Sequence, residues 1–236
     1  MKTSIKSAIF GVLLAAGLGA GSASADQIIN LQSGNGIIGG TDSAITYLRG
    51  PANGPFAGPF TATDFSSAQA GPSANIITPH SSWQPKTIGT AQWISDRPTG
   101  ASEGSSVLYA IDFTITDAFL TAASISFDFS VDNLIGGGPN PALFINGTAL
   151  TGSLTGNGFS GTNNFSAAGF QSLLTTGVNT LYINSTDVGG PAGLLFSTTI
   201  TTGGGAAIAV AEPHLVAIFG LGLIGLGMAR RKQRRT

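Results

Sequence analysis

A strict alternation of apolar and polar side chains between Ala123 and Val131 is the feature that most constrains the fold of this chain. The odd positions are apolar and the even positions carry Ser or Asp. Successive side chains of a strand point to opposite faces, so this segment predicts a strand with one buried face and one face in water. Val107–Thr116 places its odd-numbered side chains, all apolar, on one face, and shorter β-rich runs cover Val178–Ile183 and Gly193–Thr201. We therefore expect an all-β fold of antiparallel strands.

Turn signals separate these strands. Asn146-Gly147 predicts a tight turn between two short strands, and Gly136–Pro139 predicts a loop. Only Ser166–Thr175 has the spacing of a short helix. Many short strands with Gly, Asn and Pro between them are typical of a β-sandwich, here of jelly-roll type, over residues 26–202. A solenoid is the rival architecture, but the sequence contains no convincing repeat of fixed period.

The two alternating strands are joined by residues 117–122, so we expect them to pair side by side as antiparallel neighbours. That pairing places Phe113 beside Phe127 on the buried face and leaves Asp112 and Asp128 on the polar faces. Residues 26–90 are richer in Pro and Gly and more weakly patterned, and we interpret them as outer strands and loops of the same module.

Charge is scarce and unevenly distributed along the chain. Charged residues make up 9% of the sequence, against roughly 25% in typical proteins. Residues 26–212 hold three basic and eleven acidic side chains, a net charge of −8. Such a body repels phosphate, which argues against a nucleic-acid partner. The absence of cysteine excludes disulfides, thiolate zinc sites and a cysteine nucleophile, and the two histidines, His80 and His214, lie in unrelated contexts.

The first 25 residues have the organisation of a signal peptide. Two lysines precede an apolar stretch over residues 8–20, and Ala23 and Ala25 then form the small-x-small pattern that signal peptidase recognises. We expect cleavage before Asp26. The alternative is an uncleaved membrane anchor, for which the apolar stretch is short.

The last 26 residues, 211–236, follow a linker at residues 203–210 and have three parts. The Ala211-Glu212-Pro213 motif comes first, then an uncharged run over 215–229, and finally a cluster of basic residues. A helix of about 15 residues spans roughly 22 Å, which is short of the roughly 30 Å hydrocarbon core, so a transient inner-membrane anchor is expected, with the basic end in the cytoplasm. A plain tail anchor is the alternative.

This order of motif, apolar helix and basic tail resembles the PEP-CTERM sorting signal of Gram-negative bacteria that make exopolysaccharide. The resemblance implies processing by the membrane protease and transpeptidase exosortase, which removes the helix and tail, followed by release to the cell surface or exterior. Glu212 and Pro213 match the Pro-Glu-Pro motif, whereas Ala211 replaces its first proline.

The stretch from Trp93 to Thr201 resembles the galactose-binding-like β-sandwich. The matching landmarks are Trp93-Ile94-Ser95, Tyr109 with Phe113, Val131-Asp132-Asn133, Leu143–Gly147, Phe165, Gly177–Leu181 and Gly190–Gly193. The resemblance implies a sandwich in which Asp-Asn ends a strand before the Asn-Gly turn. It does not define sugar-binding residues.

Chemistry-bearing residues are few. Asp96, Asp112, Asp128 and Asp132 are the acids that an unrecognised catalytic pair would use, but carboxylates on polar strand faces are ordinary. Calcium is the better chemical hypothesis, since Asp132, Asn133 and the carbonyl groups of residues 136–140 could supply oxygen ligands. The interpretation without a metal is a turn held by bonds from side chains to the backbone.

The two tryptophans are the aromatic rings that could stack on a sugar. For Trp93 we expect core packing, while Trp83 is a candidate for carbohydrate binding with core packing as its alternative. The sequence therefore predicts a non-enzymatic, exported surface or matrix protein, without a cofactor unless calcium binds, which associates with exopolysaccharide. The alternative is an exported carbohydrate-active enzyme with an acidic pair.

Overall fold

The computed structural model describes residues 26–99, 104–116, 120–151, 154 and 156–204. Its elements are β1 (Gln27–Gln32), β2 (Thr41–Arg49), α1 (Ala62–Gln69), β3 (Ser73–Ile76), β4 (Ile94–Ser95), β5 (Val107–Ile115), β6 (Leu120–Ile135), β7 (Leu143–Ile145), β8 (Thr148–Ala149), β9 (Gly156–Ala168), the 3₁₀ helix η1 (Gln171–Leu173), β10 (Gly177–Thr186) and β11 (Gly193–Gly204). The strand-rich, all-β fold expected from the alternation is confirmed.

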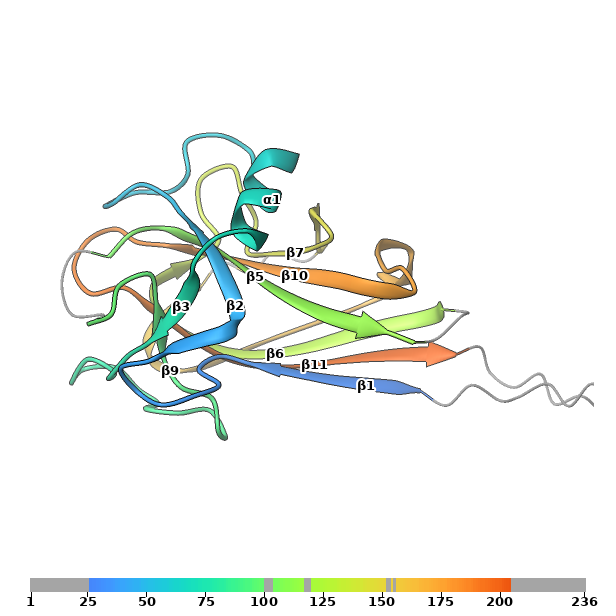
Figure 1. Ribbon diagram of the computed structural model, residues 1–236, viewed down its shortest axis with the longest axis horizontal. Coiled ribbons are helices and arrows are strands. Elements are labelled where there is room, and N and C mark those ends of the chain that lie inside the picture. Colours follow the sequence, from blue (N-terminus) through green and yellow to red (C-terminus); the bar gives the residue numbers. More distant parts are fainter. Residues whose placement is uncertain (1–25, 100–103, 117–119, 152–153, 155, 205–236) are drawn as a thin grey trace, which may run out of the picture. The chain divides into compact units, whose positions relative to one another are not determined.

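The strands form two layers of antiparallel sheet that face each other (Figure 1). One layer runs β8-β7-β10-β5-β2-β3, and the other contains β9, β6, β11 and β1 in that order. The short strand β4 links the layers by pairing with β3 and β11, and the ends of β10 and β6 pair as well. The jelly-roll type of connectivity stays a prediction.

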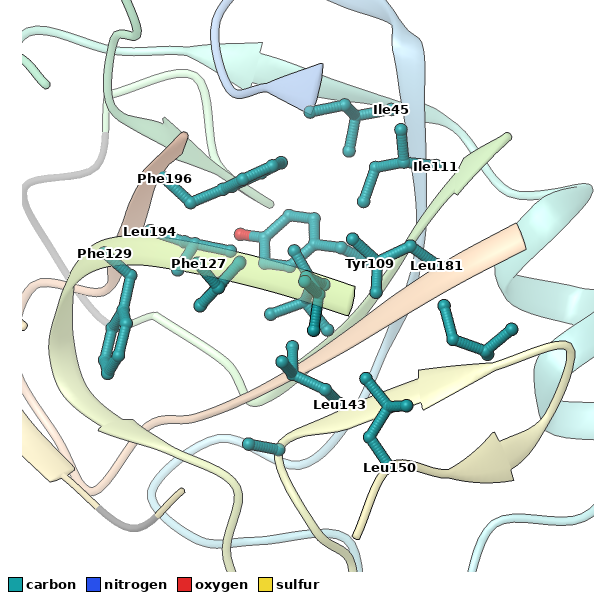
Figure 2. Close-up of a cluster of buried hydrophobic side chains, with 14 of the residues drawn as sticks. Ile45, Tyr109, Ile111, Phe127, Phe129, Leu143, Leu150, Leu181, Leu194 and Phe196 are labelled. Atoms are coloured by element: carbon teal, nitrogen blue, oxygen red, sulfur yellow. The ribbon is translucent and has the colours of Figure 1, made fainter. Parts of the chain in front are cut away.

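The main core lies between the two layers. Figure 2 shows Tyr109 of β5 and Leu181 of β10 together with Phe127 of β6 and Phe196 of β11. The rings of Phe127 and Phe196 stack with their centroids 5.7 Å apart. Phe113 belongs to the same buried cluster as these rings. The apolar faces predicted for both alternating strands are therefore confirmed.

The predicted pairing of those two strands is wrong. β5 pairs with β10 and β2, whereas β6 pairs with β11 and β9. The two strands lie in opposite layers, so Asp112 and Asp128 do not project from neighbouring strands. The physical reason is that alternation identifies the face that a strand buries, and two such faces can meet across a core as well as side by side.

A second cluster covers the outer face of the β7-β10-β5-β2 layer. Here α1 places Phe65 against Phe144 and Tyr182, with ring centroids 5.2 and 4.7 Å away. Thr61 begins the helix with a capping box, in which its hydroxyl oxygen accepts from the N–H of Asp64 at 3.3 Å and the carboxylate of Asp64 accepts from the N–H of Thr61 at 2.8 Å.

Several local expectations need correction in this region. The sequence predicted outer strands and loops where α1 forms, because the helix has a weak apolar stripe. β2 is also not an outer strand, since it lies between β5 and β3. The helix expected over Ser166–Thr175 is limited to η1, because β9 continues to Ala168 and the N–H of Gly169 donates to the carbonyl of Ala123.

The signal peptide at residues 1–25 and the sorting segment at residues 211–236, with their predicted helices, lie outside the described residues. Within the described part of the chain, no helix is long and apolar enough to cross a membrane.

Candidate functional site

A third cluster covers the outer face of the second layer at one end of the strands. The segment over residues 77–93 crosses this face and buries Trp83 and Trp93, whose rings lie 4.3 Å apart, against Leu195. Gly193 makes the packing possible, because a Cβ there would lie 2.7 Å from the ring of Trp83. The segment also covers Ser130 and Asp132 of β6, which are buried and bond to Gln84 and Trp83.

Trp83 and Asp132 are hydrogen-bonded partners, although they are far apart in sequence. The indole Nε1–H donates to Oδ2 of Asp132 at 2.7 Å, and the side-chain amide of Asn133 donates to Oδ1 at 2.7 Å. Asp132 is 4% exposed. Burial raises the pKa of this carboxyl above the usual 3.8, the bond from Trp83 opposes the shift, and the charge of Asp187 adds to it.

Asn133 extends this network to the loop that follows β10. Its Oδ1 accepts the N–H of Val188 at 2.9 Å. Asp187 is fully buried, and its carboxylate accepts the N–H of Gly189 at 3.0 Å and that of Asn53 at 3.3 Å. Asn133 thus holds the loop after β10 against the end of β6, and Asp187 connects the same loop to the backbone of Asn53.

A hollow of about 300 Å³ opens beside this network. It is lined by Asn133, Leu134, Gly158, Phe159, Ser160 and Val188. Phe159 is 37% exposed and Val188 is 56% exposed, so the lining combines accessible apolar side chains with an amide and a hydroxyl. We call it the loop-end hollow.

The first residues of β9 are held in place by hydrogen bonds to β6 and to the segment over residues 77–93. The hydroxyl of Ser130 donates to the carbonyl groups of Gly158, at 2.7 Å, and Gln84, at 3.1 Å. The N–H of Gln84 donates to the carbonyl of Phe159. Phe159 is therefore presented on a backbone fixed to both β6 and the segment over residues 77–93, which reduces the entropy that a ligand would have to remove.

The described acids do not form a catalytic pair open to a substrate. Asp96 is ion-paired with Arg49, with Nε to Oδ2 at 2.7 Å. Asp112 accepts from the hydroxyl of Thr180, and Asp128 accepts from the side chain of Asn164. Asp187 is close enough to raise the pKa of Asp132, but both are buried and both accept N–H groups of the protein.

Several of the oxygen atoms proposed for calcium also have protein donors. The carbonyl of Gly137 accepts the N–H of Asn140, and the carbonyl of Asn140 accepts the N–H of Gly137 and the amide of Asn184. Oδ1 and Oδ2 of Asp132 and Oδ1 of Asn133 face N–H groups, as described above. No cluster of three or more His, Cys, Asp or Glu side chains occurs among the described residues. The geometry therefore adds no support for a calcium ion at Asp132 and Asn133.

Sequence reasoning singled out Trp83 and Asp132 separately and missed a third part of this site. Trp93 is buried, as predicted, and Trp83 is 1% exposed, which is the core packing that the sequence left open as its alternative. Trp83 supports Asp132. Phe159 was missed, although a single aromatic residue within the glycine-rich run Gly156–Gly161 is a signal of an exposed ring. The motif residues Ala23, Ala25, Ala211, Glu212 and Pro213 lie outside the described part of the chain.

No protein-family model matches the chain, and no curated protein matches it. Among solved structures, this chain is similar to the CBM35 module from Paenibacillus barcinonensis, with 14% identity and a TM-score of 0.34 over 73% of this chain and 97% of that one. It is also similar to CBM35 from Cellvibrio japonicus Abf62, with 12% identity and a TM-score of 0.33 over 75% of this chain and 99% of that one. A family 35 carbohydrate binding module from Clostridium thermocellum gives 9% identity and a TM-score of 0.31 over 53% of this chain and 86% of that one.

Proposed function

We propose that this chain is an exported, non-catalytic surface or matrix protein whose β-sandwich binds polysaccharide in the loop-end hollow. The observation that carries the proposal is the combination of the exposed ring of Phe159 and the side chain of Val188 with the polar groups of Asn133 and Ser160 around one hollow. A sugar ring has apolar C–H faces and polar hydroxyl edges, and such a lining complements both.

The charge distribution supports a neutral ligand. The described lining residues of the hollow carry no charge, and the nearest carboxylates are buried under hydrogen bonds. A phosphorylated or strongly anionic ligand would meet a body of net charge −8 without a cationic group in the lining. We therefore expect a neutral polysaccharide or oligosaccharide.

The test is a glycan array probed with residues 26–204, which contain every described strand and all three buried clusters. Phe159→Ala and Val188→Ala should each weaken binding to the glycans found, and Phe159→Ala by about tenfold or more, as for an aromatic anchor. Val178→Ala is the matched control, because Val178 is exposed to a similar extent, 65%, but does not line the hollow. Equal losses in all three variants, or none, would exclude the hollow as the binding site.

The non-catalytic part of the proposal is tested on the same glycans by measuring reducing ends. A carbohydrate-active enzyme would release them, and the raised pKa of Asp132 beside Asp187 is the observation that would then need a catalytic interpretation. No increase in reducing ends during binding is the expected result.

Export and sorting rest on the sequence of the two ends. We expect the mature protein to begin at Asp26 and to lack the apolar run and basic tail. Intact mass of the surface-released protein measures both ends, and a dominant final form that retains residues 215–236 would contradict exosortase-like processing. Glu212→Ala or Pro213→Ala should block the loss of the tail.

A further inference from the structure

β9 is an open edge of the second layer. It pairs with β6 in a continuous register from Ser124 opposite Ala168 to Phe129 opposite Asn163, and then through a shifted register to Ile135 opposite Gly156. On its other side, Gln84 bridges to Ser160 near the start of the strand, and no other described segment forms a backbone bridge to it. The later part of β9, up to Ala168, therefore has a free edge among the described residues.

The register identifies the backbone groups on that free edge. The N–H of Gly169 bonds to the carbonyl of Ala123 at 2.9 Å. Hydrogen-bonded and non-bonded positions alternate along an antiparallel pair, so Ala167 and Phe165 bond toward β6. The N–H and C=O groups of Asn164, Ser166 and Ala168 consequently point outward, away from β6.

The register of β9 with β6 is irregular between Gly158 and Asn163, but the strand lacks the charges and prolines that often prevent edge-to-edge association. Its 13 residues, Gly156–Ala168, include no charged residue and no proline. At the opposite edge of this layer, the first residue of β1, Gln27, bonds the backbone of Thr114 and Thr116 in the other layer through its side chain. β8, at the end of the other layer, has 2 residues. The regular part of β9, Asn163–Ala168, is therefore the unprotected edge of this layer.

We propose that two copies of this chain associate by antiparallel pairing of β9 with β9 of the second copy, about a two-fold axis beside Ser166. The pairing joins two four-stranded layers into one continuous sheet of eight strands. A second copy fits this edge because the same strand offers the same outward donors and acceptors at the same spacing. This inference does not use the loop-end hollow and does not depend on sugar binding.

Electrostatics and packing favour this partner. The nearest described charge on the outer face is Asp128 of β6, opposite Asn164 of β9. In the paired sheet, two copies of Asp128 lie three strand spacings apart across the sheet and four residues apart along it, a separation of roughly 20 Å, which exceeds the Debye length of about 8 Å in physiological salt. Phe165 is only partly buried against the core from its own side, so a second strand would cover more of its ring.

Sedimentation velocity of residues 26–204 over a wide concentration range tests the proposal. The expected result is a reversible equilibrium between one and two copies. Ser166→Lys places a charge on each side of the axis, and Ser166→Pro removes an outward N–H while keeping the bonds to β6, so both should weaken association about tenfold or more. Ser126→Lys is the matched control, because Ser126 lies opposite Ser166 in the same row but on the inner strand β6, and it should leave association unchanged.

Amide hydrogen exchange supplies the second measurement. Exchange at Ser166 should slow on association, whereas exchange at Phe165, which already bonds to β6, should change little. A single-copy mass at every concentration would overturn the proposal, as would loss of association in Ser126→Lys but not in Ser166→Lys. A series of species larger than two copies would overturn the two-fold arrangement. Phe159→Ala should associate normally, so failure of the sugar proposal and failure of this one are separable.

Discussion

Replacing Trp83 by phenylalanine tests whether the buried contact with Asp132 holds the candidate site together. The substitution keeps an aromatic ring beside Trp93 but removes the Nε1–H that donates to Oδ2 of Asp132 at 2.7 Å. A hydrogen bond to a charged group contributes about 1.5–3 kcal/mol. The smaller ring also leaves roughly 40 Å³ unfilled, at about 24 cal/mol per Å³, or about 1 kcal/mol. Trp83→Phe should therefore lower the free energy of unfolding by about 2.5–4 kcal/mol.

The assay is urea unfolding of residues 26–204, followed by circular dichroism at about pH 8, where an ionised carboxylate is favoured. In the Asp132→Asn background the bond is between neutral groups, so the same substitution should cost only about 1.5–2.5 kcal/mol. The coupling between the two sites is thus about 1 kcal/mol or more. Equal costs in both backgrounds, or a cost below about 1 kcal/mol in the parent, would refute the assignment of this bond as a support of the site.

Three further predictions address the protonation of Asp132, the register of β9 and the two faces of β6. Burial raises the pKa of Asp132, so the folded state keeps this proton to higher pH than the unfolded state. The contribution of Asp132 to stability is therefore greatest below the usual pKa of 3.8 and falls as the pH rises through the raised pKa. Asp132→Asn should remove that part of the pH dependence of urea unfolding, and identical pH profiles of parent and variant would contradict the prediction. Ala167→Pro removes a backbone bond to β6 and should lower the free energy of unfolding by about 3 kcal/mol or more in the same assay. Ser166→Pro should cost the single-copy form far less, and the reverse order would mean that the register of β9 is shifted by one residue. Phe127→Ala should lower the free energy of unfolding by about 3–5 kcal/mol, because it empties a buried site. Asp128→Ala should lower it by at most about 1 kcal/mol, because its partner Asn164 can bond to water instead. Similar losses in the two variants would contradict the assignment of the two faces of β6.

The strands and several turns could be predicted because their signals are local. Alternation over Ala123–Val131 reports directly which side chains are buried, and Phe127 and Phe129 are buried as expected. Asn146 and Gly147 have φ values of 51° and 81°, the left-handed region that an Asn-Gly turn between short strands requires. Such features depend on the conformational preferences of a few adjacent residues.

Strand neighbours could not be predicted in the same way. β6 pairs with β11 and β9, and either choice of partner buries the same apolar face. The candidate site has the same limitation, because Trp83, Asp132 and Phe159 come from three distant segments and meet only after the segment over residues 77–93 crosses the sheet. Asp132 and Trp83 stood out as chemistry-bearing residues, but nothing in the sequence placed one against the other.

The most direct test of the central claim is an NMR titration of residues 26–204, with amide resonances assigned, using an oligosaccharide taken from the glycans that the array identifies. Binding in the loop-end hollow predicts the largest shift changes at Asn133, Phe159, Ser160 and Val188, with little change at Ser124 and Thr201 on the open outer face of the same layer. The largest changes at Ser124 and Thr201, with none at Phe159 or Val188, would contradict the assignment of the hollow as the polysaccharide-binding site.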